Sequence, residues 1–308
     1  MAADTRSHTS GRFSLDIDGW NVGFLKKFSG LGMEADVVQN DLGTLNIQKK
    51  HVANIKWTPG KATFGIGMGK GMYEWIQAAF DKNFLTKSGT LTAADFNYKS
   101  KSELTFSGGL ITSVTVPKLD GSSKDAAYFD IEFEAETVRW AKGDDKDIKG
   151  KVGPKQKAWL CSNFMVTIGD EGSTPCKRVA SVDSFTWKCS VVSDQIGIHR
   201  EPTKHPAKVT VPEIKLAISH ADHDPWSQAA KKWFVDGYHL EGNEMQGEIK
   251  FLDPNMDPGK PLGSVSLVQV GFKKFTDDDL EANSEKIKRF NVELYVEEMK
   301  FKIDQYDA

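Results

Sequence analysis

The residues best suited to chemistry lie in the segment SHADHD, at positions 219–224. Its candidate metal ligands are His220, Asp222, His223 and Asp224. Imidazole and carboxylate groups would suit zinc or a similar ion. Nearly consecutive residues rarely converge on one ion, however, and Asp224 is explained as the N-cap of a helix with Pro225 at its first position. We therefore expect no metal here, and the other histidines show no partner pattern.

A second candidate is the glycine-rich segment GIGMGKGM (Gly65–Met72), between a predicted strand and a predicted helix. Backbone N–H groups in such a place can bind phosphate. The segment lacks the Ser or Thr that follows Gly-Lys in a P-loop, its glycines are too closely spaced, and the dinucleotide pattern is incomplete. We interpret it as a flexible loop and expect no cofactor.

Nucleophilic chemistry has little support in the sequence. Cys161, Cys176 and Cys189 lie in the second half without a CxxC pair, so we expect reduced, partly buried thiols. There is no G-x-S-x-G elbow, and no cysteine belongs to a recognisable signature with a histidine. The sequence indicates that the protein is not an enzyme.

Composition narrows the class of protein further. The 308 residues are 27% charged with a net charge of −3, so no basic nucleic-acid footprint is visible. Apolar runs stay far below the ~18 residues of a membrane span, and the first eleven residues have no secretory pattern. We expect a soluble protein made in the cytoplasm, without membrane insertion.

The elements that must position these residues are mainly strands. Alternating apolar and polar residues predict strands, and apolar residues at helical spacing around Trp75 predict a helix. The expected elements are a hairpin over Arg12–Leu31, strands at Ala35–Gln39, Thr44–Lys50 and Asn54–Gly67, a helix over Gly69–Phe84, and strands at Ala94–Lys99, Leu110–Pro117 and Ala127–Trp140.

The same order of signals returns in the second half, which indicates an internal repeat. The matching segments are Asn163–Cys189, Val209–Phe234, Gln246–Leu252, Gly263–Phe275 and Lys288–Ile303. We predict a first domain over 12–142, a polar linker over 143–158 and a diverged second domain over 159–304. The alternative is two unrelated α/β domains that share a strand-helix-strand order.

The opening of the chain resembles a known family. FSLDIDG followed by GFLKKFSGLGME, in Phe13–Glu34, resembles the start of phage tail-tube proteins. These share their fold with the hemolysin-coregulated tube protein of type VI secretion and with tubes of extracellular contractile injection systems. The segment IKWTPGKATFGIG before the Trp75 helix is also similar, so the resemblance covers about 12–140 well. It is weaker over 159–303, where Ser184 and Phe185 replace Ser29 and Gly30.

The resemblance implies mainly β modules, each a β-sandwich or small barrel with one α-helix, here two in tandem. It also implies a structural tube protein of a contractile phage tail or injection system, with modules side by side in rings that stack around a channel. We favour a trimer with pseudo-sixfold symmetry, because it needs only one new contact type; a hexamer two layers tall is the alternative. Implied partners are sheath and baseplate proteins, with cargo effector or DNA in the lumen. Assembly is expected in the bacterial cytoplasm.

Two residue sets carry this expectation. The candidate lumen-facing residues are Asp130, Glu132, Glu134, Glu136, Glu293 and Glu297, and the candidate assembly or fold motif is Phe13, Gly19, Gly23, Phe24, Gly30 and Leu31. Acidic rows would keep a channel wet and non-adhesive toward cargo, although they could equally face solvent in a monomer.

Other roles remain open. The chain could be a baseplate hub or tube-end adaptor of the same particle. It could instead be a soluble two-domain ligand-binding module that uses SHADHD or the glycine-rich segment. That module would be a stable monomer, whereas a tube protein forms rings as its concentration rises.

Overall fold

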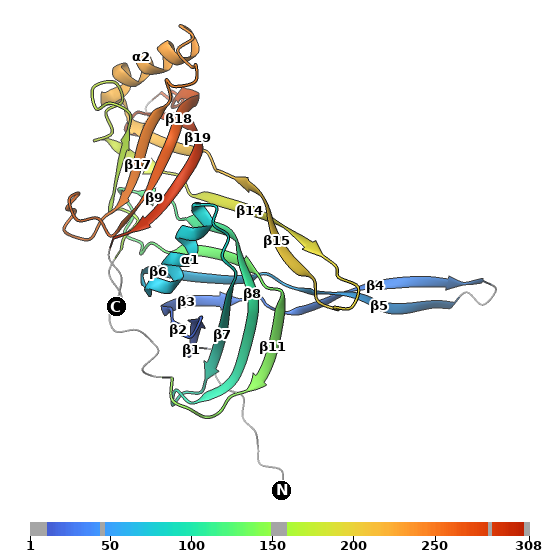
Figure 1. The fold of residues 1–308 in the computed structure, drawn as a ribbon. Coiled ribbons are helices and arrows are strands. Elements are labelled where there is room, and N and C mark those ends of the chain that lie inside the picture. Colours follow the sequence, from blue (N-terminus) through green and yellow to red (C-terminus); the bar gives the residue numbers. More distant parts are fainter. Residues whose placement is uncertain (1–10, 44–46, 149–158, 283–284, 305–308) are drawn as a thin grey trace.

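A computed structural model describes residues 11–43, 47–148, 159–282 and 285–304, and it is mainly β, as predicted (Figure 1). The first half contains β1 (Phe13–Ile17), β2 (Trp20–Asn21), β3 (Gly23–Ser29), β4 (Met33–Leu42), β5 (Ile47–Trp57), β6 (Gly60–Met68), α1 (Lys70–Phe80), β7 (Lys87–Ala94), β8 (Ser100–Val116), β9 (Leu119–Asp120), β10 (Phe129–Glu134) and β11 (Thr137–Lys142). The second half contains β12 (Phe164–Ile168), β13 (Val179–Val182), β14 (Phe185–Asp194), β15 (Thr203–Thr210), β16 (Ile214–Ser219), the 3-10 turn η3 (His220–Asp222), α2 (His223–Phe234), β17 (Met245–Phe251), β18 (Gly263–Asp277) and β19 (Arg289–Ile303).

The strands form three sheets. A ten-stranded sheet runs β2-β1-β7-β8-β10-β6-β3, with β11, β14 and β15 attached beside β8. A seven-stranded sheet runs β12-β17-β18-β19-β16-β13-β9. The strands β4 and β5 form a separate ribbon that projects from the body (Figure 1).

Both halves pair their strands in the same order, as the predicted repeat requires. In the first half β1 pairs with β7, β7 with β8, β8 with β10, β10 with β6, and β6 with β3. In the second half β12, β17, β18, β19, β16 and β13 follow the same path. Each half also has a hairpin, β4–β5 or β14–β15, and one α-helix. The strands on these two paths, the hairpin and the α-helix of one half therefore each have a counterpart in the other.

The helices lie where the apolar spacing placed them. On α1 the buried residues include Met72, Trp75, Ile76, Ala79 and Phe80, the face that the sequence predicts. On α2 the smaller set Trp226, Ala230 and Trp233 is buried. In the described part of the chain, no helix combines the length and the apolar composition of a membrane span.

The predicted opening hairpin is only partly formed. The chain does turn at Asp18 and Gly19, which both have positive φ, but β1 and β2 then share just two residue pairs. At Gly23, where φ is +89°, the chain bends and β3 leaves to pair with β6. The second apolar run therefore belongs to a different part of the sheet from the first.

The strand predicted over Ala127–Trp140 is two strands, β10 and β11, and the strand β7 was not predicted. Three further differences from expectation arise from local backbone chemistry. The strand predicted over Asn54–Gly67 is two strands, broken at Pro59, which has no N–H to donate. The strand predicted over Ala94–Lys99 is a turn, in which the Asp95 carboxylate accepts the N–H groups of Asn97 and Lys99.

The third difference is the start of the second helix. Asp222, and not Asp224, is its N-cap, and the turn η3 precedes it. Most of the predicted linker, residues 149–158, lies outside the described residues, and the domain boundaries stay a prediction. The linker's first part is attached to the first half, because Ile148 is buried and its N–H donates to Tyr98.

A close crossing of two segments fixes the exit of β3. Gly30 has φ +96°, and a Cβ atom there would lie 1.9 Å from the carbonyl oxygen of Pro59. On either side, Leu31 N donates to Thr58 O at 3.1 Å and Thr58 N donates to Gly32 O at 2.9 Å. Only glycine fits this crossing, since any side chain would meet backbone atoms that cannot move aside.

We expect Gly30→Ala to lower the free energy of unfolding by more than about 1 kcal/mol, because both the backbone angle and the close contact oppose a Cβ. The matched control is Gly71→Ala on α1, where a Cβ meets nothing within 4 Å. That change should raise stability by up to about 1 kcal/mol. Urea unfolding followed by tryptophan fluorescence measures both, and a Gly30→Ala protein as stable as wild type would contradict the assignment.

Candidate functional site

The two halves of the chain are joined by a β-ladder that crosses between them. The first residues of β14, Phe185–Lys188, pair antiparallel with the end of β8, Ser113–Val116. Across this ladder the hydroxyls of Thr115 and Thr186 lie 2.9 Å apart. A shorter ladder joins β9 to β13. Each large sheet therefore includes a strand from the other half.

Aromatic side chains fill the junction behind this ladder. Trp187 of β14 is 1% exposed and stacks on Phe80, the last residue of α1, with ring centroids 5.0 Å apart. Phe80 also stacks on Phe301 of β19 at 5.6 Å. Each such pair adds about 0.5–1.5 kcal/mol beyond the apolar area that it buries. The helix of the first half is thus held by two strands of the second.

Ion pairs fix the β14–β15 hairpin across the first half. Lys204 Nζ donates to Glu134 Oε2 at 2.8 Å, and the Lys204 backbone N–H donates to Glu136 Oε1 at 2.9 Å. Arg139 binds Glu201 through two hydrogen bonds of 2.6 Å. The bond from Arg139 lowers the pKa of Glu201 below its usual value.

The counterpart of the β8 edge lies open in the second half. The correspondence follows from residues that pair across three neighbouring strands. In the first half these residues are Val114, Ile131 and Ala62, and in the second half they are Phe275, Val292 and Leu216. Lys274–Asp277 therefore stands where Ser113–Val116 stands. Within the described residues, the side of Lys274–Asp277 away from β19 pairs with no strand, because the β17 ladder ends at Val270.

The counterparts of the junction aromatics are exposed. Phe28 pairs with Ala62, and Val182 pairs with Leu216, so Phe28 and Val182 occupy matching positions in the two halves. Met33 lies five residues after Phe28, as Trp187 lies five residues after Val182. Met33 is 66% exposed, whereas Trp187 is 1% exposed.

The other two correspondences follow in the same way. Phe234 ends α2 as Phe80 ends α1, and it is 47% exposed. Val138 pairs with Phe106 as Met299 pairs with Leu267, so Val138 and Met299 occupy matching positions. Trp140 and Phe301 each lie two residues further along the chain. Trp140 is 47% exposed. The chain therefore has one covered junction and, at its two ends, the uncovered surfaces of the same kind of junction.

The β4–β5 ribbon is the most exposed part of these surfaces. Its cross-strand pair Val37 and Val52 is 60% and 66% exposed, and Val38 and Ile47 are also exposed. An isolated two-stranded ribbon is marginally stable in water, and its open edges can pair with another strand. The ribbon corresponds to β14–β15, which lies on the first half (Figure 1).

The predicted acidic rows carry paired charges. In the first row, Lys61 Nζ lies 2.5 Å from Glu132, and the two acids that follow bind Lys204 at the junction. In the second row, Lys215 Nζ lies 3.5 Å from Glu293, whereas Glu297 is exposed. The strand faces with these rows therefore carry both signs of charge. Which face lines a lumen stays a prediction.

The glycines of the predicted assembly or fold motif adopt backbone angles that favour glycine. Gly19, Gly23 and Gly30 have φ values of +81°, +89° and +96°. Leu31 is fully buried and Phe13 packs against the core. Phe24 lies in β3, and its side chain lies outside the described part of the structure. This supports the fold role of the motif, and its assembly role stays a prediction.

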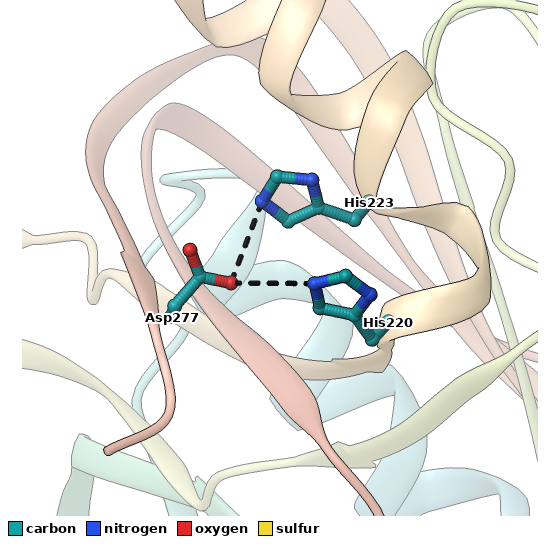
Figure 2. Close-up of side chains that lie close together, drawn as sticks. All are labelled: His220, His223 and Asp277. Atoms are coloured by element: carbon teal, nitrogen blue, oxygen red, sulfur yellow. Dashed lines mark ion pairs between the residues drawn. The ribbon is translucent and has the colours of Figure 1, made fainter. Parts of the chain in front are cut away.

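The structure separates the residues of the SHADHD segment. Asp222 is bound by Arg178, with Oδ1 2.5 Å from the guanidinium, and Asp224 is exposed. His220 and His223 come together with Asp277 of β18, a residue that the sequence did not connect with them (Figure 2).

The glycine-rich segment is not the flexible loop that the sequence suggested. Gly65–Met68 is the end of β6, and Gly69 joins it directly to α1. The Tyr73 hydroxyl donates to the Ile66 carbonyl at 2.7 Å, and Gly69 N donates to Val22 O. The Ile66 carbonyl and the Gly69 N–H are therefore engaged within the fold.

The junction aromatics were not singled out from the sequence. The available signal was the aromatic or apolar residue at matching places of the two copies, such as Phe80 and Phe234 at the helix ends. Pattern alone could not tell which copy is covered, because the covering strand comes from the other half.

Comparison with known proteins finds one family for the first half of the chain. Residues 9–139 match the family model of the T4-like virus tail tube protein gp19. A search of curated proteins finds no match.

Solved structures give three further likenesses, each covering less than half of this chain. A chain of an extracellular contractile injection system, the PVC sheath-tube complex in the extended state, is 21% identical, with TM-score 0.41 over 46% of this chain and 95% of that one. The anti-feeding prophage (AFP) tube terminating cap is 23% identical, with TM-score 0.41 over 46% and 100%. Hcp1 from Flavobacterium johnsoniae is 14% identical, with TM-score 0.26 over 42% and 95%.

We expect Trp187→Ala to destabilise the chain by about 3–5 kcal/mol, because it removes a buried ring from the junction between the halves. Met33→Ala, at the corresponding exposed place, should change the free energy of unfolding of the monomer by less than about 0.5 kcal/mol. Denaturant titration at low protein concentration measures both. Equal effects at the two positions would contradict the correspondence.

Burial raises the pKa of the Cys176 thiol to about 11 and also raises the pKa values of Cys161 and Cys189. The thiolate is the reactive form, so at pH 8 on the order of 0.1% of Cys176 can react. We expect iodoacetamide at pH 8 to label all three thiols in denaturant and to leave Cys176 unlabelled in the native protein. Rapid native labelling of Cys176, seen by peptide mass spectrometry, would show that the site is open.

Proposed function

We propose, on the premise that residues 9–139 belong to the T4-like tail tube family, that this chain is a structural subunit of a tube in a contractile phage tail or phage-tail-like injection system. The observation that carries the proposal is the junction between the halves. It joins two modules side by side through β14 and β8, and the chain exposes the counterparts of both partners at its ends. The work of the protein is then mechanical, without catalysis.

In the proposed ring, the internal junction is repeated between chains. The ribbon β4–β5 of one chain lies on the second half of the next chain, as β14–β15 lies on the first half within a chain. The segment Leu31–Glu34, where the chain enters the ribbon, pairs with the open β18 edge at Lys274–Asp277. Met33 and Trp140 then meet Phe234 of the next chain, which buries three exposed apolar side chains.

Charges at the outer surfaces support this pairing. In the internal ladder Lys188 pairs with Ser113. Glu34 is the counterpart of Lys188, and Lys274 is the counterpart of Ser113. The outer ladder therefore places a carboxylate opposite an ammonium group, a favourable cross-strand pair. On the same pattern, Lys50 corresponds to Lys204 and lies toward Glu297, the counterpart of Glu136.

Repeated head-to-tail contacts of this kind close into a ring when the rotation angle from one module to the next is a whole fraction of a full turn. We propose a trimer with six modules and pseudo-sixfold symmetry, and a hexamer two layers tall is the other closure. Rings that stack give a channel for cargo effector or DNA, with sheath outside and baseplate at one end. Assembly takes place in the bacterial cytoplasm before the particle is released.

Sedimentation velocity and negative-stain microscopy of the purified chain test the proposal. We expect three chains per ring, in proportions that rise with protein concentration, and filaments of stacked rings. Rings that never stack would instead favour the baseplate hub or tube-end adaptor role. A chain that stays monomeric at all concentrations would overturn the tube assignment and favour a ligand-binding module.

We expect Met33→Asp or Phe234→Asp to prevent ring formation, because each places a charge in the buried centre of the outer junction. Both side chains are exposed in the single chain, so the unfolding midpoint should stay close to that of wild type. The matched control is Phe96→Asp, which changes an equally exposed aromatic residue in the turn between β7 and β8. Loss of rings in the control as well would show that any exposed charge change disrupts assembly, which contradicts the assigned surface.

A further inference from the structure

We propose that His220, His223 and Asp277 form a binding site for a divalent transition-metal ion of the zinc class. The three residues come from two elements: the histidines flank the start of α2, and Asp277 ends β18 (Figure 2). Each offers one ligand atom, and these atoms all lie within 4.8 Å of one another.

The distances suit a small tetrahedral ion. Ligand atoms bound to zinc at about 2.0–2.2 Å lie roughly 3.3–3.6 Å apart. His223 Nε2 lies 3.4 Å from Asp277 Oδ1, and His220 Nε2 lies 4.0 Å from the same oxygen. A shift of His220 by about half an ångström brings its Nε2 atom into that range from Asp277 Oδ1. Its side chain is partly exposed and has room to make that shift.

His223 is held in the orientation that a ligand needs. Its ring lies 5.5 Å from both Phe275 and Phe290, measured between ring centroids. Its Nδ1 atom lies 3.6 Å from the Asp224 carboxylate, on the side away from Asp277. Asp224 thus lies on the side of the ring from which a carboxylate supports a metal-binding histidine, at a distance longer than a direct hydrogen bond.

A polar atom in the cluster also lacks a hydrogen bond. His223 Nε2 is buried, and within the described residues it makes none, although it faces Asp277. Buried polar atoms normally have a partner. The two histidine rings are stacked, with centroids 4.7 Å apart, so both nitrogens face one carboxylate oxygen. An ion between them would satisfy all three groups.

The ligand types select the class of ion. Two imidazoles and one carboxylate suit zinc and its first-row neighbours, whereas Mg²⁺ and Ca²⁺ prefer oxygen ligands only. Three protein ligands leave one position of a tetrahedral ion for water or another group. The neighbouring Asp222 and Asp278 are engaged elsewhere, Asp222 by Arg178 and Asp278 by Asn291 and the Arg289 N–H.

The cluster belongs to the second half alone. Val116 stands in the first half where Asp277 stands in the second, and it pairs with Phe185 in the internal junction. The metal site therefore lies at the open β18 edge. Its existence does not depend on assembly, so it can be measured in a chain that forms no rings.

Isothermal titration of ZnCl₂ into the metal-stripped full chain tests the site, in wild type and in Met33→Asp. We expect one Zn²⁺ per chain with a dissociation constant in the micromolar range or below, in both proteins. His223→Gln and Asp277→Asn should each weaken binding by about tenfold or more. CoCl₂ should give the visible absorption of a four-coordinate ion in wild type and lose it in both variants.

The matched control is His199→Gln, which removes an exposed histidine in the β14–β15 turn and should leave zinc binding unchanged. Circular dichroism shows whether each variant is folded. Absence of saturable zinc binding to folded wild type would overturn the site, as would equal loss of affinity in His199→Gln. Binding without ring formation would leave the site in place and count only against the proposed function.

Discussion

The structure depends on the ladder that joins β14 to the end of β8. Without it, the β8 edge would lie open and Trp187 would have no place against Phe80. The β14–β15 hairpin, its ion pairs with Glu134 and Arg139, and the contact of α1 with Phe301 all follow from that one pairing. Within the chain, the edge of β8 is therefore completed by the β14–β15 hairpin of the second half.

The internal junction and the proposed junction between chains differ in chemistry. Inside the chain, Trp187 and Phe301 cover α1, and Lys204 reaches Glu134 and Glu136. At the open ends, Met33 stands in place of Trp187 and Trp140 in place of Phe301. Such differences let an interface reject the wrong partner as well as bind the right one, because a mismatched pairing buries unpaired charge. The divergence between the halves fits this need.

Much of the fold could be predicted from the sequence, because alternation and helical spacing report directly on buried faces. The strand YFDIEFE and the helix around Trp75 are examples. The breaks at Pro59 and at the Asp95 turn were missed, since local backbone hydrogen bonding overrode the apolar pattern there. The link between His223 and Asp277 could not be predicted, because sheet register brings together residues more than fifty positions apart. The same limit hid the pairing of β14 with β8.

The pairing of an early strand with a late one also sets an order of events during synthesis. The first half emerges from the ribosome with its β8 edge and the Phe80 face uncovered, and the β8 edge stays so until β14 has been made. The tether between the halves then supplies its own hairpin at an effective concentration of roughly millimolar. That local excess favours closure within one polypeptide over exchange with another nascent chain, so the second half is the first partner that the first half meets.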